Sequence, residues 1–104
     1  MELGILGRIL IYRLIAEKGP IARAGIEKLL AEHPELHFTL GKSIGLNEFL
    51  DWSVKKRGII EEAGRLRISP LGANVVASMR SSKVENALNV FGVRKASDRA
   101  AAHA

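Results

Sequence analysis

The 104-residue sequence contains no cysteine, and aromatic residues make up only 5% of it. The absence of cysteine excludes disulfide bonds and thiolate metal ligands and favours a reducing compartment, so we expect a cytoplasmic protein. A long apolar run is also lacking, because Arg8 and Arg13 interrupt the hydrophobic N-terminal segment, and we expect no membrane association. The remaining composition, 47% hydrophobic and 26% charged residues, is typical of one small globular domain.

Residues 43–58 are predicted to form a helix. Its apolar residues recur at spacings of three and four and therefore share one face: Leu46, Phe49, Leu50 and Val54. Ser43 is suited to cap the start of this helix. Gly58 follows the basic run 55–57, a combination typical of a helix C-terminus that ends in a left-handed residue.

A short basic hairpin is predicted to follow this helix. Ile59 and Ile60 favour an extended chain, and Gly64 supplies a tight turn. Arg65 and Arg67 then alternate with apolar residues, which places both arginines on the open face of the hairpin. The hairpin is bounded by residues 69–70, where serine and then proline are typical of a helix start.

Helices are predicted on both sides of this segment. A core helix is expected at about residues 3–17, with buried apolar side chains at Ile5, Ile9, Leu10, Tyr12 and Ile15. A second helix is expected at about 22–32, with an inward face of Ile26, Leu29 and Leu30. Residues 33–42 form either a brief strand around 37–40 or an irregular loop. After residue 69, the apolar stripe of a further helix consists of Leu71, Val75, Val76 and Met79.

The last predicted helix spans residues 81–92. Ser82 and Glu85 have the spacing of a capping box, and Gly92 stands where a helix should stop. Its apolar face forms either a lid on the core or half of a dimer interface: Val84, Leu88 and Phe91. We favour the interface, because a two-fold arrangement doubles the contacts with DNA phosphates. The alanine-rich segment 93–104 is expected to be a flexible tail.

Two stretches carry a resemblance to a known family. Residues 9–30, which end a helix in Lys-Gly-Pro-Ile, resemble the first two helices of small archaeal winged helix-turn-helix regulators. The run RGIIEEAGRLRISPLG at 57–72 is similar to their recognition-helix end, wing and last helix start. The resemblance implies a mainly α winged helix-turn-helix domain over 1–80, with a three-helix core, a β-hairpin wing and additional C-terminal helices. It implies DNA binding, although the same fold also serves protein docking.

Positive charge lies almost entirely in the second half of the chain. Residues 1–54 hold six Lys and Arg against seven Asp and Glu, a net charge of −1. Residues 55–104 hold ten against four, a net charge of +6. This asymmetry suits phosphate contacts, although a basic surface can also be simply a solvated one.

The sequence predicts a double-stranded DNA-binding protein that acts as a transcriptional regulator, as a homodimer. The candidate DNA-binding residues lie on the predicted recognition helix and hairpin: Lys42, Ser43, Asn47, Lys55, Lys56, Arg57, Arg65 and Arg67. Asn47 is the residue best suited to contact adenine, but Glu48 and Asp51 share its outward face and repel phosphates. The alternative is therefore a protein-interaction module that docks through Glu48, Asp51 and Trp52. Trp52 otherwise closes the core, which is the usual place of a large aromatic residue.

We predict no enzymatic activity, cofactor or metal. His33 and His37 have a four-residue spacing, but Pro34 breaks the helix that would place them together, and no third ligand of suitable type is placed nearby. No nucleophile, base and orienting group can be assembled from the residues present.

Overall fold

A computed structural model describes residues 4–40 and 44–92 of the chain. Within them the fold is mainly helical with one two-stranded antiparallel hairpin, as the sequence predicted. Two short 3-10 helices, η1 and η2, accompany five α-helices. The elements, in chain order, are η1 (Gly4–Leu6), α1 (Gly7–Lys18), α2 (Arg23–Glu32), η2 (Pro34–Leu36), α3 (Leu46–Lys55), β1 (Ile59–Glu62), β2 (Arg65–Ile68), α4 (Pro70–Ala77) and α5 (Ser82–Phe91).

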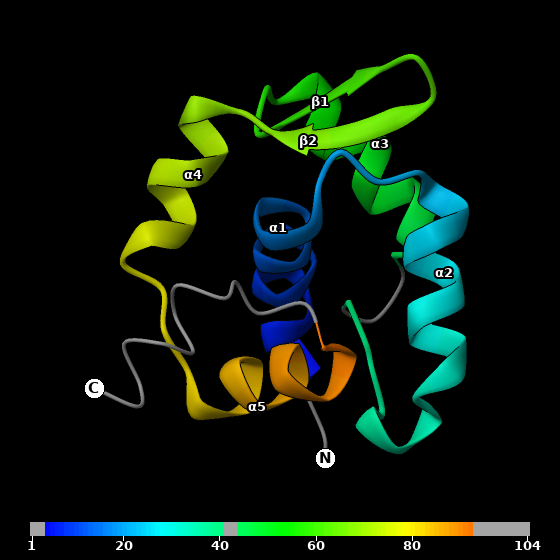
Figure 1. The fold of residues 1–104 in the computed structure, drawn as a ribbon. Helices are drawn as coiled ribbons and strands as arrows, with labels where there is room; N and C mark the ends of the chain where they lie inside the picture. The colour runs from blue at the N-terminus through cyan, green and yellow to red at the C-terminus, as the bar shows by residue number, and fades with distance from the viewer. Residues whose placement is uncertain (1–3, 41–43, 93–104) are drawn as a thin grey trace.

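Helix α1 lies at the centre of the fold, with the hairpin above it and α4 and α2 on opposite sides (Figure 1). Its fully buried side chains form the middle of the core: Leu10, Ile11, Leu14 and Ile15. Tyr12 is buried and Ile9 half-buried, but the prediction for Ile5 was wrong, because its side chain is 85% exposed. Ile5 lies in η1, whose tighter turn breaks the helical phase that was assumed from residue 3 onward.

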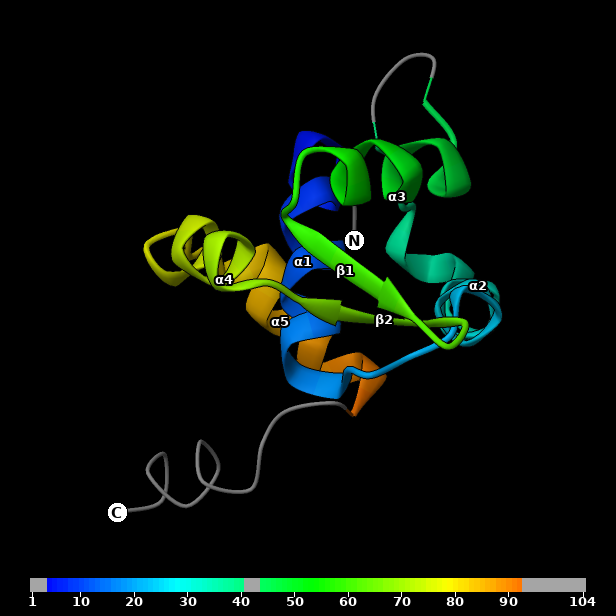
Figure 2. The same ribbon diagram turned by 90° about the horizontal axis from the view of Figure 1, so that it is seen from above.

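The hairpin is anchored to the rest of the fold through Leu66. Ala63 and Gly64 form its turn with φ of 54° and 76°, which is the left-handed geometry that two-residue hairpin turns favour. The turn predicted at Gly64 is thus confirmed. Leu66 also pairs with Ile21, between α1 and α2, through two backbone hydrogen bonds of 2.9 and 2.7 Å. The hairpin is therefore held across the end of α1, as Figure 2 shows from above.

The junction between α3, β1 and α4 differs in one respect from the prediction. Arg57, not Gly58, takes the left-handed conformation, with φ of 65°. Gly58 is buried, and any side chain there would collide with the hydroxyl of Tyr12. The predicted cap is confirmed, since the Ser69 hydroxyl accepts a hydrogen bond of 2.9 Å from the backbone N–H of Gly72. The same hydroxyl lies 2.6 Å from the Arg57 carbonyl, so it ties the end of α3 to the start of α4.

Helix α5 completes the core, and the predicted dimer interface was wrong. Val84 and Leu88 are fully buried and Phe91 is 8% exposed, because α5 packs its apolar face on α1 of the same chain. These side chains are not available to a second copy. The capping box was also wrong: the helix begins at Ser82, and the Glu85 carboxylate binds the Arg13 guanidinium. Gly92 ends the helix with φ of 68°, as predicted.

The connection between α2 and α3 contains η2 followed by extended chain. Residues 37–40 form no strand, so the irregular-loop alternative is correct for the described part of this connection. Leu36 and Leu40 are nevertheless buried and join the core. Helix α3 begins at Leu46, with Gly45 preceding it. Lys42, Ser43 and the tail 93–104 lie outside the described residues.

Candidate nucleic-acid interface

The last turn of α3 carries a cluster of exposed cations. Lys55 and Lys56 lie at the end of the helix, and Arg57 follows in its left-handed conformation. All three side chains are exposed, and none of them forms an ion pair with any other residue of the described ranges. Their charges are therefore available to a ligand.

The hairpin adds two arginines on one face. Because cross-strand partners share a face, the pairing of Ile60 with Arg67 and of Glu62 with Arg65 places both arginines on the outer face of the hairpin. Arg67 donates to Glu62 across 2.8 Å, with the two side chains 48% and 65% exposed. Such an exposed pair contributes little free energy and is readily exchanged for another anion. The prediction of two arginines on the open face is confirmed.

The two groups of cations adjoin. Arg57 and Ile60 line the same surface hollow between the end of α3 and the start of α4, and Ile60 is the cross-strand neighbour of Arg67. We call the five cations the basic surface: Lys55, Lys56, Arg57, Arg65 and Arg67. The chain that joins α3 to β1 is only residues 56–58, so this arrangement follows directly from the short connection.

Arg23 pairs with two of the nearby acids. Its guanidinium forms a bidentate pair with Glu61, at 2.9 Å for both contacts, and lies 2.7 Å from Asp51. The hydrogen bonds from Arg23 lower the pKa of the Glu61 carboxyl, and those carboxylates raise the pKa of Arg23. The network joins α2, α3 and β1. The sequence gives no local sign of this network, because Arg23, Asp51 and Glu61 lie far apart in the chain.

The outward face of α3 is less suited to base contacts than predicted. The Asn47 side chain is engaged at both ends: its amide nitrogen donates to Glu27 across 3.2 Å, and its oxygen accepts from Arg23 across 3.3 Å. Contact with adenine would require Asn47 to give up these partners. Glu48 is exposed and forms no ion pair within the described ranges, so one acid remains on this face.

Trp52 does not close the core. Its side chain is 48% exposed and stacks on Phe49, with ring centroids 6.3 Å apart and an interplanar angle of 19°. The edge of the apolar stripe on α3 is thus solvent-facing. The exposed indole was the alternative that the sequence left open.

The two histidines are not brought together as ligands. The His33 ring lies 3.1 Å from the Glu35 carboxylate and edge-on to Phe91. No group of three potential metal-ligating side chains occurs in the described part of the chain. Within the same ranges, none of the helices has the length and apolar character needed to span a membrane.

No family model matches the sequence, and neither the curated proteins nor the solved structures include a match to it.

Proposed function

We propose that this chain is a winged helix-turn-helix protein that binds double-stranded DNA and regulates transcription. The order of α1, α2, α3 and hairpin, with Ile21 paired to the second hairpin strand, supports the winged-helix assignment. The observation that carries the DNA-binding proposal is the basic surface. Five exposed cations lie at the end of α3, in the connection that follows it and on β2, while Arg23 pairs with two of the neighbouring acids.

The proposed contact is mainly with phosphates. The side chains of the basic surface match a polyanion, whereas Glu48 and the engaged Asn47 disfavour base contacts by α3. We therefore expect binding that depends only weakly on DNA sequence and strongly on salt concentration. A homodimer stays a prediction, and its interface would have to lie elsewhere, because Val84, Leu88 and Phe91 lie in the chain's own core.

The test is the salt dependence of binding to a labelled random duplex, measured by fluorescence anisotropy. Each phosphate contact contributes about 0.9 to the slope of log K against log salt, so Arg65→Ala with Arg67→Ala should flatten the slope by about two units. The matched control is Arg80→Ala with Lys83→Ala. It removes the same charge from exposed positions near α5, which lies at the opposite end of the fold from the hairpin (Figure 1).

The Glu62→Gln variant gives a test of opposite sign. It frees Arg67 from its exposed pair and removes a negative charge from the hairpin, so DNA affinity should rise. Equal slopes for the hairpin variant and its control, together with no gain from Glu62→Gln, would refute phosphate binding by the hairpin.

The alternative function is a protein-docking module. The exposure of Trp52 beside Glu48 favours it, whereas Asp51, although its side chain is exposed, already has Arg23 as an ion-pair partner. A random duplex that neither binds at low salt nor changes the fluorescence of Trp52 would favour this alternative over DNA binding.

A further inference from the structure

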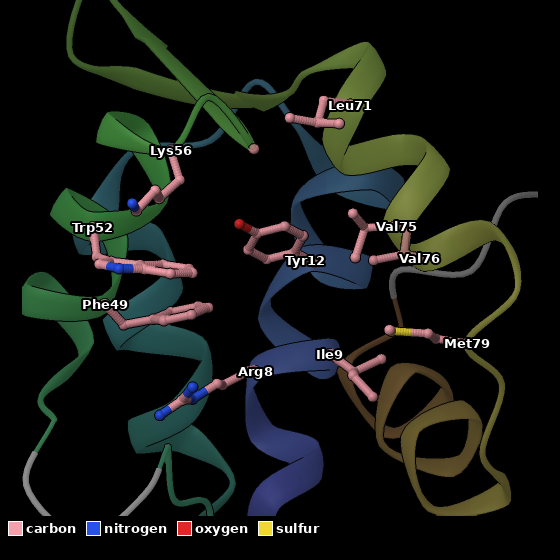
Figure 3. A pocket seen from close by; sticks show the side chains of 11 residues that line it. Arg8, Ile9, Tyr12, Phe49, Trp52, Lys56, Leu71, Val75, Val76 and Met79 are labelled. Atoms are coloured by element: carbon pink, nitrogen blue, oxygen red, sulfur yellow. The ribbon is translucent and has the colours of Figure 1, made fainter.

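An apolar groove of about 310 Å³ runs between α3 and α4, with α1 as its floor (Figure 3). Phe49 and Trp52 form the wall from α3, and Leu71, Val75 and Met79 form the opposite wall. Four of the six exposed large hydrophobic residues in the described chain line this groove: Trp52, Leu71, Val75 and Met79. A scatter of single apolar residues is ordinary on a protein surface, but a contiguous group indicates a binding site.

The charged side chains that line the groove, Arg8 and Lys56, are both cations. Arg8 lies at one end and Lys56 at the other (Figure 3), and none of the described lining residues is acidic. Arg8 is held by a 3.0 Å hydrogen bond from its Nε to the Leu40 carbonyl, with its guanidinium 6.0 Å from the centroid of the Phe49 ring. Lys56 forms no ion pair within the described ranges.

The hydroxyl of Tyr12 is the third donor. The ring rises from α1, and its oxygen points into the groove toward the side of Lys56 and Trp52 (Figure 3). This oxygen has no hydrogen-bond partner among the side chains and backbone groups described. An apolar site with a few convergent polar groups is the usual form of a small-molecule site, and its volume lies at the lower end of the range of roughly 300–1,000 Å³.

We propose that this groove binds a small hydrophobic carboxylate. The apolar body lies between the aromatic wall of α3 and the aliphatic wall of α4, and the carboxylate accepts from the Tyr12 hydroxyl and the Lys56 ammonium. Charge complementarity selects this occupant, because the groove offers donors and positive charge but no acidic group. A second copy of the chain on this groove would bring the same cations toward one another. The proposal does not depend on DNA binding.

Trp52 reports directly on occupancy, because it is the only tryptophan and forms one wall. Octanoate, which does not absorb at the wavelengths that excite tryptophan, is the probe, and 1-octanol is the neutral control with the same number of carbon atoms. Octanoate should shift the emission saturably and bind more tightly than octanol. Lys56→Gln should weaken octanoate binding by about two- to fivefold, the effect of one exposed ion pair, and leave octanol unchanged. Equal binding of both probes, or no effect of Lys56→Gln, would overturn the proposal.

Two valines provide a matched pair of variants. Val75 lines the groove and Val90 lies on α5 outside it, and both side chains are 42% exposed. Val75→Glu places a carboxylate in the groove and should weaken octanoate binding at least tenfold, whereas Val90→Glu should leave it within twofold. Circular dichroism establishes that both variants are folded. Octanoate binding that survives Val75→Glu would overturn the proposal. So would a dimer in sedimentation equilibrium that Val75→Glu alone dissociates, because a second copy would then fill the groove.

Discussion

Replacing Glu85 by alanine should destabilise the fold through a charge left behind in its interior. Arg13 is only 6% exposed although it is charged, because it lies on the central helix α1. Its guanidinium binds the Glu85 carboxylate through both terminal nitrogens, at 2.5 and 3.3 Å, and lies 3.8 Å from Glu17. Glu85→Ala removes the nearer carboxylate and leaves the arginine buried.

The magnitude follows from the burial of each partner. Removing one member of a buried ion pair costs about 3–5 kcal/mol. The Glu85 side chain is 23% exposed and Glu17 remains as a weaker partner, so we expect a cost at or somewhat below the lower limit of that range, about 2–3 kcal/mol. Urea denaturation, monitored by circular dichroism at 222 nm, measures the free energy of unfolding. The comparison holds if the slope of this free energy against urea concentration is the same for the variant and the wild type.

The control is the other cation that contacts the same carboxylate. Arg80 lies 3.5 Å from Glu85 with its side chain 67% exposed, so Arg80→Ala should change stability by no more than about 0.5 kcal/mol. The double variant Arg13→Met with Glu85→Leu should regain much of the loss, because it removes both charges and fills the space with apolar atoms. A Glu85→Ala variant no less stable than Arg80→Ala would refute the account of Arg13 as a buried charge held by Glu85.

Two further predictions concern α3 and its neighbours. Ser53→Ala should raise the free energy of unfolding by about 0.5–1 kcal/mol in the same urea assay. The Ser53 hydroxyl is buried without a hydrogen-bond partner among the described residues, and alanine is the better helix former. A loss of stability in this variant would contradict the prediction. Arg23→Met removes the ion pair that Arg23 forms with Glu61. In the wild type this pair lowers the pKa of the Glu61 carboxyl in the folded state. The stabilisation by the pair is therefore fully present above the unfolded glutamate pKa of about 4.3 and is lost as pH falls through the lower folded value. The difference in the free energy of unfolding between wild type and Arg23→Met should therefore be largest at neutral pH and smaller below about pH 4. A difference that is the same at neutral pH and below about pH 4 would refute the pairing.

Local signals in the sequence were sufficient for the hairpin and the start of α4. Gly64 permits the tight turn, and serine followed by proline at residues 69–70 is typical of a helix start. Each feature is therefore determined by a few neighbouring residues. The end of α3 was not decided locally. The sequence predicts Gly58 as the left-handed residue, but Arg57 takes this conformation instead. Position 58 is glycine because a side chain there would collide with Tyr12, which is distant in sequence.

Long-range pairs explain what was missed at the basic surface. The five cations of this surface could be found from the sequence, because they lie in two short runs, 55–57 and 65–67, and only three residues connect α3 to the hairpin. The Arg23 network could not, since its guanidinium meets Glu61 and Asp51 from other elements and sequence spacing carries no sign of such pairs. Glu85 shows the same limit: its spacing from Ser82 matched a capping box, but a buried arginine offered a stronger partner.

The apolar groove escaped prediction because helical periodicity does not distinguish a buried stripe from an exposed one. The sequence predicts the apolar stripe of the helix after residue 69 at Leu71, Val75, Val76 and Met79, but only Val76 of these is buried and the other three are exposed. The face that α4 buries is instead marked by Gly72 and Val76, because a side chain at Gly72 would collide with the Gly58 carbonyl. The glycine lets α4 approach the end of α3 closely, and this contact turns the more apolar stripe outward to form a wall of the groove.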